Sequence, residues 1–155
     1  TRRPGDGAAL LAQALGQELG ADVVAPDAIM SIGCDVFSPN ALGAILNEEG
    51  IARLDCAIVA GGANNQLARP ENGTMLAERG ILYAPDYVIN AGGIISVTME
   101  YLCRRQDAPC DINEVRKRIA LIPERLVRIW QDSEAQGSSP DRVADAMAQE
   151  LIGRG

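Results

Sequence analysis

One short apolar run that gives way to a turn of small residues constrains the fold of this chain more than any other feature. Residues 81–84 (ILYA) are typical of a strand, and Pro85 ends that strand because its ring fixes φ and removes a hydrogen-bond donor. The turn 90–93 (NAGG) follows, and the apolar-rich stretch 94–102 can then form a helix. A strand, a small-residue turn and a helix N-terminus are a common ligand-binding arrangement in α/β proteins. The segment therefore predicts an α/β fold with a site at this turn.

Two upstream segments repeat this arrangement. The apolar run 56–60 (CAIVA) leads into 61–66 (GGANNQ), and the run 34–37 (CDVF) leads into 38–43 (SPNALG). Continuous apolar runs of this length are typical of strands that a parallel sheet buries on both faces. The carboxyl ends of such strands lie along one edge of the sheet, where ligands bind. We therefore expect the three polar turns to form one site.

Helical patterns alternate with these strands. Leu11, Leu15 and Leu19 recur at helical spacing before Gly20, which predicts a helix over 8–19. The other predicted helices cover 41–46, 48–54, 70–79, 94–105, 112–135 with a break at Pro123, and a last helix that Ser139 caps and Pro140 begins. A short strand is predicted over 23–25, and a turn or single helical turn over 26–30. This alternation implies parallel β/α units.

The chain has 155 residues, which suits one domain, and its charge argues against several partners. A net charge of −7 argues against nucleic acid or an acidic membrane surface, because both need clustered positive charge. No apolar run approaches the length of about 18 residues that a membrane span needs. Residues 1–4 (TRRP) lack the apolar region of a signal peptide, so we expect a cytoplasmic protein. The chain starts with Thr1 and not with Met, which suggests processing or a fragment.

Cysteine, histidine and lysine usage limits the chemistry. The chain has 4 cysteines, none in a CxxC pattern, and no histidine, so we expect no metal site. Cys34 and Cys56 lie in apolar runs and are predicted to be buried thiols. Cys103 and Cys110 flank a loop, where free thiols are favoured over a disulfide in a cytoplasmic chain. Lys117 is the one lysine and lies in a charged helical run, so the sequence offers no convincing base for proton transfer.

Two longer segments resemble a known enzyme family. The segments 34–47 (CDVFSPNALGAILN) and 58–93 (from IVAGGANN to PDYVINAGG) are similar to the amino-acid dehydrogenases that act on glutamate, leucine, phenylalanine and valine, and more similar to the last three than to the first. The matching region is the later half of that family's nucleotide-binding domain. The resemblance implies an incomplete Rossmann-like α/β fold, with a doubly wound parallel sheet and C-terminal helices. Residues 1–110 would form the latter part of a dinucleotide-binding domain, and residues 111–155 a helical segment that packs on it.

The resemblance also implies a set of site residues. The cofactor-binding residues would be Asn40, Ala41 and Leu42 on the adenosine side, and Gly62, Asn64 and Asn90 near the nicotinamide. Ile119 and Ile122 would help to line the pocket for the substrate side chain. From the residues alone, Asn64 also fits a turn with left-handed backbone, and Asn90 also fits a helix cap. For the carboxylates Asp35 and Asp86, structural turn or cap roles are favoured.

The implied activity is oxidative deamination of a small apolar L-amino acid to a 2-oxo acid and ammonia by a homo-oligomer, with NAD as the cofactor and NADP as the alternative. Gly5-Asp6-Gly7 does not match the family's glycine-rich phosphate loop, and the family's acid–base residues belong to its substrate domain. We therefore expect the 155-residue chain alone to be inactive. Arg2 and Arg3 could suit a 2′-phosphate, although a solvated terminus is favoured. The competing hypothesis is a non-catalytic nucleotide-binding or oligomerisation module.

Overall fold

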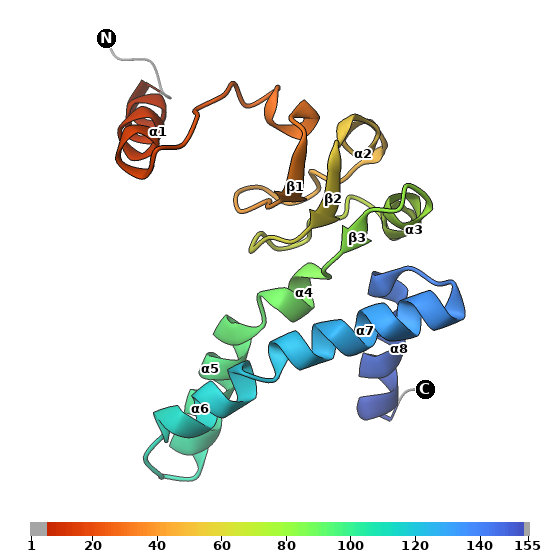
Figure 1. Ribbon diagram of the computed structural model, residues 1–155. Helices are drawn as coiled ribbons and strands as arrows, with labels where there is room; N and C mark the ends of the chain where they lie inside the picture. The colour runs from red at the N-terminus through yellow and green to blue at the C-terminus, as the bar shows by residue number, and fades with distance from the viewer. Residues whose placement is uncertain (1–5, 154–155) are drawn as a thin grey trace.

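The computed structural model describes residues 6–153, which form an α/β fold around a three-stranded parallel sheet (Figure 1). The strands are β1 (Cys34–Phe37), β2 (Cys56–Val59) and β3 (Leu82–Tyr83), in the spatial order β1-β2-β3. Two rows of side chains run across the sheet: the open row is Val36, Ile58 and Leu82, and the buried row is Phe37, Val59 and Tyr83. The predicted α/β class and incomplete Rossmann-like sheet are confirmed.

Two crossover helices bury one face of the sheet. α2 (Glu48–Arg53) and α3 (Glu71–Glu78) pack Ile51 and Leu76 against the buried row. Asn47 begins α2, because its side-chain oxygen accepts a hydrogen bond from the Gly50 N–H at 2.8 Å. The main hydrophobic core therefore lies between the sheet and these two helices.

The open row lies on the opposite face, since neighbouring residues of a strand point to opposite sides. Val36 and Leu82 keep 47% and 36% of their surface exposed. α1 (Asp6–Leu19) stands apart from the sheet in Figure 1. Within residues 6–153, this face of the sheet is therefore apolar and only partly covered: Val36 and Leu82 are exposed and Ile58 is half-buried.

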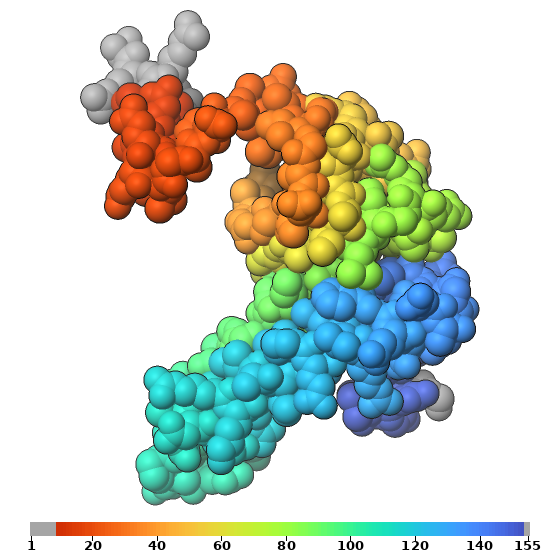
Figure 2. Space-filling model, viewed as in Figure 1, coloured from red at the N-terminus to blue at the C-terminus, as the bar shows by residue number. Residues whose placement is uncertain are grey.

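The chain continues after β3 in a group of helices. They are α4 (Asp86–Ile89), α5 (Gly92–Arg105), α6 (Ile112–Ile119), α7 (Ile122–Gln136) and α8 (Pro140–Leu151). α5 and α6 lie side by side and project away from the sheet (Figures 1 and 2). A second core forms around Ala84, Ile122 and Leu126, and the Trp130 indole N–H donates to the Tyr83 carbonyl at 2.9 Å. These contacts fix α7 against the end of β3.

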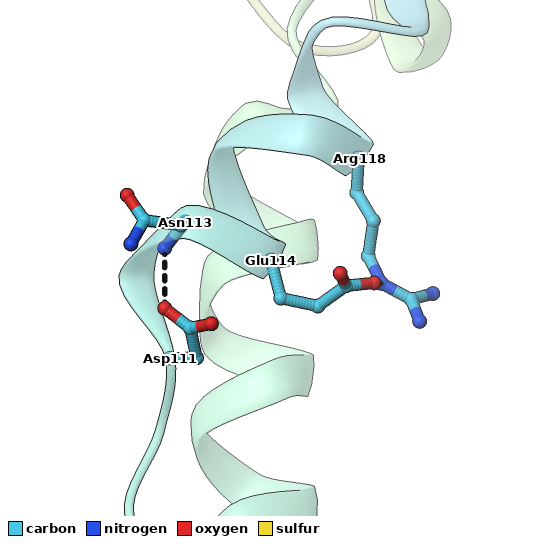
Figure 3. Close-up of polar contacts among 4 residues, drawn as sticks. All are labelled: Asp111, Asn113, Glu114 and Arg118. Carbon is cyan, nitrogen blue, oxygen red and sulfur yellow. Dashed lines mark hydrogen bonds and ion pairs between the residues drawn. The ribbon is translucent and has the colours of Figure 1, made fainter.

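Capping explains where α6 begins (Figure 3). Asp111 Oδ1 accepts a hydrogen bond from the Asn113 N–H at 2.9 Å, as an N-cap residue does. Glu114 and Arg118 form an ion pair one turn apart at 3.2 Å, on the exposed side of the helix. α6 ends at Ile119 and α7 begins at Ile122, with a proline in its first turn. The predicted break at Pro123 is therefore confirmed.

Two predicted elements are wrong. Residues 23–25 form no strand, because Val23 and Val24 are exposed and have no neighbouring strand with which to pair. Residues 41–46 form no helix. Leu46 instead makes a parallel bridge with Leu67, and Ala44 has a positive φ of 57° that a right-handed helix does not allow. Pairing with the neighbouring loop thus overrides the helical propensity of this segment.

Several side-chain predictions also need correction. Cys34 is exposed rather than buried because it begins an edge strand, whereas Cys56 is half-buried and its burial raises its thiol pKa. Ser139 makes no capping hydrogen bond to α8. The N-cap of α5 is Ala91, so Asn90 does not cap that helix. Cys103 and Cys110 are free thiols, and the hypothesis for Arg2 and Arg3 lies outside the described residues.

Candidate functional site

A cleft of about 540 Å³ lies where β2 and β3 end. Its walls come from the loop after β2, from α4 and the start of α5, and from the start of α8. Asn64 and Asn90 both line it, together with Asp86, Tyr87 and Ile94. The carboxyl ends of parallel strands are where α/β folds bind ligands, so this cleft is the candidate site.

Two asparagines from different strand ends meet in this cleft. Asn90 Nδ2 donates to Asn64 Oδ1 at 2.5 Å and to the Gly62 carbonyl at 3.3 Å. Asn64 is exposed and Asn90 is half-buried. Among residues 6–153, no protein group bonds to Asn64 Nδ2 or Asn90 Oδ1. The pair therefore presents one donor and one acceptor group that a ligand can use.

Asn40 connects the end of β1 to the same site. Its Oδ1 accepts from the Gly62 N–H at 2.8 Å, and its Nδ2 donates to the Ser38 carbonyl at 3.0 Å. The two residues after Asn40 are both exposed: Ala41, and then Leu42, which is 79% exposed. The structure thus brings Asn40, Gly62, Asn64 and Asn90 into one continuous network, whereas the side chain of Leu42 faces solvent.

A buried glutamine shapes the turn that carries Asn64. Gln66 Nε2 donates to the carbonyls of Gly61 and Ala63 at 2.7 and 2.9 Å, and the side chain of Gln66 is fully buried. A Cβ at Gly61 would lie 2.2 Å from the Pro39 carbonyl oxygen, so only glycine fits there. The turn between β2 and residue 66 is therefore held both from within and by the neighbouring loop.

A buried carboxylate holds the same turn from the other side. Asp86 is 7% exposed, and its Oδ2 accepts from the Asn65 N–H at 2.5 Å. Its Oδ1 accepts from the Tyr83 hydroxyl at 3.0 Å. Burial, and then the nearby Asp86 carboxylate, raise the pKa of Tyr83 well above its usual range. Asp86 begins a helical turn, α4, where the sequence predicts a structural turn or cap role for it.

A second tyrosine joins α4 to the last helix. The Tyr87 hydroxyl donates to Asp145 Oδ1 at 2.7 Å and also lies 3.0 Å from the Asp141 carbonyl oxygen. Burial, followed by the hydrogen bond to Asp145, raises the pKa of Tyr87. Sequence reasoning missed Gln66 and Tyr87 and favoured only a turn or cap role for Asp86. The bonds of Tyr87 to α8 and of Asp86 to Asn65 join segments far apart in the chain, whereas Gln66 bonds locally to Gly61 and Ala63.

The two isoleucines predicted to line a substrate pocket lie elsewhere. Ile122 is buried in the second core, and Ile119 packs against that core. Neither lines the cleft that holds Asn64 and Asn90. A role for the isoleucines in substrate binding stays a prediction.

Asp35, one of the two carboxylates considered in the sequence, is exposed on β1.

The described side chains of residues 9–153 include no group of three or more cysteine or acidic residues placed to hold a metal ion. In the same range no helix combines the length and the apolar character that crossing a bilayer requires.

Comparison with known proteins places this chain in a family. The profile described as "Glutamate/Leucine/Phenylalanine/Valine dehydrogenase" matches residues 8–152. The chain belongs to this family of dehydrogenases. It is 45% identical over 136 residues to the leucine dehydrogenase of Thermoactinomyces intermedius, a match that covers 88% of this chain and 36% of that protein. It is 41% identical over 134 residues to an L-tryptophan dehydrogenase of Nostoc punctiforme, covering 86% of this chain and 36% of the relative.

Solved structures agree with this assignment. The crystal structure of L-tryptophan dehydrogenase from Nostoc punctiforme superimposes with a TM-score of 0.83 at 39% identity, covering 92% of this chain and 41% of that one. The hetero-hexameric glutamate dehydrogenase from Thermus thermophilus superimposes with a TM-score of 0.68 at 22% identity, over 98% of this chain and 37% of that one, which supports the fold alone. The chain therefore spans about two fifths or less of these relatives.

Proposed function

We propose that this chain is the cofactor-binding part of an NAD(P)-dependent amino-acid dehydrogenase. The observation that carries the proposal is the Asn64–Asn90 pair, two carboxamides from successive strand ends that meet in one cleft at 2.5 Å. The family supports the reaction class: the relatives are named leucine, tryptophan and phenylalanine dehydrogenases. The proposed reaction is oxidative deamination of a small apolar L-amino acid to a 2-oxo acid and ammonia.

The residues present fit a nicotinamide cofactor. Its carboxamide and ribose hydroxyls both donate and accept hydrogen bonds, as the Asn64–Asn90 pair does. The backbone beside the pair is open: a Cβ at Gly93 would meet no atom within 4 Å. A Cβ at Gly62 would meet only Asn40 Oδ1, at 3.0 Å. Glycines at such positions let a ligand approach the backbone closely.

Each residue has a distinct part in this proposal. Asn64 and Asn90 would hold the nicotinamide end, and Asn40 would keep the Gly62 turn in place beside it. When bound, the cofactor supplies the hydride acceptor, while the protein supplies position and electrostatics. Ala41 and Leu42 would contact the adenosine side, and Ile119 and Ile122 would help to line the pocket for the substrate side chain.

Asparagine replacement tests this proposal directly. Asn64→Ala and Asn90→Ala should each weaken NADH binding to the intact protein by about 1–3 kcal/mol, because each leaves a polar partner unsatisfied. A fluorescence titration with NADH measures the affinity. Asn113→Ala is the matched control, since Asn113 is exposed on α6 and lies far along the chain from the cleft. Unchanged NADH affinity in both cleft variants would contradict a cofactor role and favour a non-catalytic module.

Parallel titrations and assays would define the finer points. NADPH in place of NADH distinguishes the two cofactors, and NAD is our expectation. Turnover of leucine, valine, phenylalanine and glutamate by the intact protein identifies the substrate. Turnover of glutamate alone would contradict the proposed preference for a small apolar side chain.

A further inference from the structure

A single buried residue, Asp86, is hydrogen-bonded to both segments that carry the asparagine pair. Asp86 Oδ2 accepts from the backbone N–H of Asn65, the residue directly after Asn64, at 2.5 Å. The backbone carbonyl of Asp86 accepts from the N–H of Asn90 at 3.0 Å. One residue is thus bonded to the turn after β2 through its side chain and to the turn after β3 through its backbone.

The Asn65 backbone is held by such a fixed partner. Its φ is +53°, a left-handed conformation that asparagine adopts more readily than other non-glycine residues but that hydrogen bonds to its backbone stabilise further. The carboxylate of Asp86 supplies a charge-assisted hydrogen bond at this point, and such bonds are about twice as strong as neutral ones. The Asn65 carbonyl is also held, by the Ala44 N–H at 2.7 Å. The conformation at Asn65 sets the direction in which Asn64 leaves the turn.

The burial of Asp86 is itself unusual without a cation beside it. The ion pairs among the side chains of residues 9–153 are three pairs one helical turn apart, and Asp86 belongs to none of them. A buried carboxylate is costly unless hydrogen bonds compensate for the lost hydration. Here the donors are the Asn65 N–H and the Tyr83 hydroxyl. Burial of an apolar residue here would cost less free energy, so we attribute the presence of a carboxylate to the hydrogen bonds that it accepts.

We propose that Asp86 is the positioning residue of the candidate site: its carboxylate fixes the Asn65 backbone and thereby sets the distance and orientation between Asn64 and Asn90. Asp86 acts through these asparagines and touches no ligand in this role. The inference rests on the proposed function for its consequence, which is cofactor affinity. The structural claim is that the Asn64–Asn90 contact depends on Asp86. This claim can be tested without any ligand.

Three substitutions separate position from charge. Asp86→Ala removes both acceptor oxygens. Asp86→Asn is neutral as well, but it keeps one oxygen for the Asn65 N–H and an amide that can donate to the Tyr83 oxygen. Asp86→Glu keeps the charge but carries the carboxylate one methylene further from the backbone. If position matters, Asn rescues the site and Glu does not, whereas a purely electrostatic role gives the reverse order.

The first measurement needs no cofactor. In ¹⁵N-labelled protein, the Asn65 amide should exchange slowly with solvent, and the side-chain amide resonances of Asn64 and Asn90 should be distinct from those of exposed asparagines. Asp86→Ala should speed the exchange at Asn65 and shift both side-chain resonances, and Asp86→Asn should restore them. Unchanged resonances of Asn64 and Asn90 in folded Asp86→Ala would overturn the proposal. So would fast exchange of Asn65 in the wild-type protein.

The second measurement is NADH affinity of the intact protein. Asp86→Ala should weaken binding about 10- to 150-fold, the range expected when one hydrogen bond to a charged group is lost. Asp86→Asn should weaken binding only about 3- to 12-fold, because a neutral bond keeps roughly half of the strength of the charged one. Asp86→Glu should bind as weakly as Asp86→Ala. If Asp86→Ala does not fold, by circular dichroism, the Asn and Glu variants alone decide between position and charge.

The outcomes for this inference and for the proposed function can be told apart. If wild-type protein fails to bind NADH, the proposed function falls, while the amide resonances still decide whether Asp86 positions the asparagines. If wild-type protein binds NADH and all three Asp86 variants bind equally well, the proposed function stands and the positioning role of Asp86 falls.

Discussion

Tyr83 connects the core of the sheet to the candidate site through one side chain. Its ring belongs to the buried row and is fully buried. Its hydroxyl donates to Asp86, and its carbonyl accepts from Trp130. Desolvation and then the carboxylate of Asp86 raise the pKa of this phenol. The residue therefore joins three parts of the molecule: the sheet, α4 and α7.

This raised pKa predicts a loss of stability at alkaline pH. Below pH about 10, Tyr83 is protonated in both the folded and the unfolded state, so its full contribution to stability is present. Above about 10 the unfolded chain loses this proton first, and the free energy of unfolding falls as the pH rises further. Tyr83→Phe should lower the free energy of unfolding at pH 8 by about 1–3 kcal/mol, because Asp86 loses a donor. The variant should also show a shallower decline above pH 10.

Urea unfolding at several pH values between 8 and 11 measures both effects. Tyr101→Phe is the matched control, because Tyr101 is exposed on α5. Identical slopes above pH 10 in wild type and Tyr83→Phe would contradict the prediction.

At the scale of elements, the sequence predicts what local chemistry determines. The three strands are recognisable because each is a short apolar run followed by glycine, proline or asparagine. The break before α7 is recognisable because a proline cannot continue α6. The helix predicted over 41–46 fails because Leu46 pairs with Leu67, a contact that no local pattern reveals. Parallel topology also predicts that Asn64 and Asn90 lie at one edge, but not that Asp86 bonds to the turn between them.

The docking of α8 gives a second prediction at this scale. The Tyr87 hydroxyl joins α4 to α8, because it bonds to the side chain of Asp145 and to the carbonyl of Asp141. Tyr87→Phe removes both bonds and should cost about 1 kcal/mol of stability, with faster amide exchange along α8 than in the sheet. Hydrogen exchange followed by mass spectrometry separates the two regions. Uniform acceleration in both, or none in α8, would contradict a local role, and Tyr101→Phe again serves as the control.

The two faces of the sheet differ in how far helices cover them. The buried row of the sheet lies beneath α2 and α3, while the open row stays only partly covered within residues 6–153. Val97 and Tyr101 on α5 are also apolar or aromatic and exposed. Exposed apolar side chains of this kind favour association, and a partly covered face of a sheet favours it more than single scattered side chains do. We therefore expect this chain to self-associate, in agreement with the homo-oligomer that the family resemblance implies.

A lysine substitution should affect self-association differently in the open row and on the exposed side of α5. Val36→Lys places a positive charge in the open row, where Val36 is 47% exposed, and should raise the monomer fraction without reducing the strand content. Val97→Lys makes the same change on α5, where Val97 is 61% exposed, and should leave association unchanged if the sheet face is the contact. Sedimentation velocity across micromolar concentrations measures the monomer fraction, and circular dichroism checks that both variants stay folded. If Val97→Lys dissociates the oligomer and Val36→Lys does not, the chain self-associates through its helices and not through the sheet face. A wild-type chain that stays monomeric at high micromolar concentration would remove the basis for the prediction, since an apolar sheet face would then be tolerated in water without a partner.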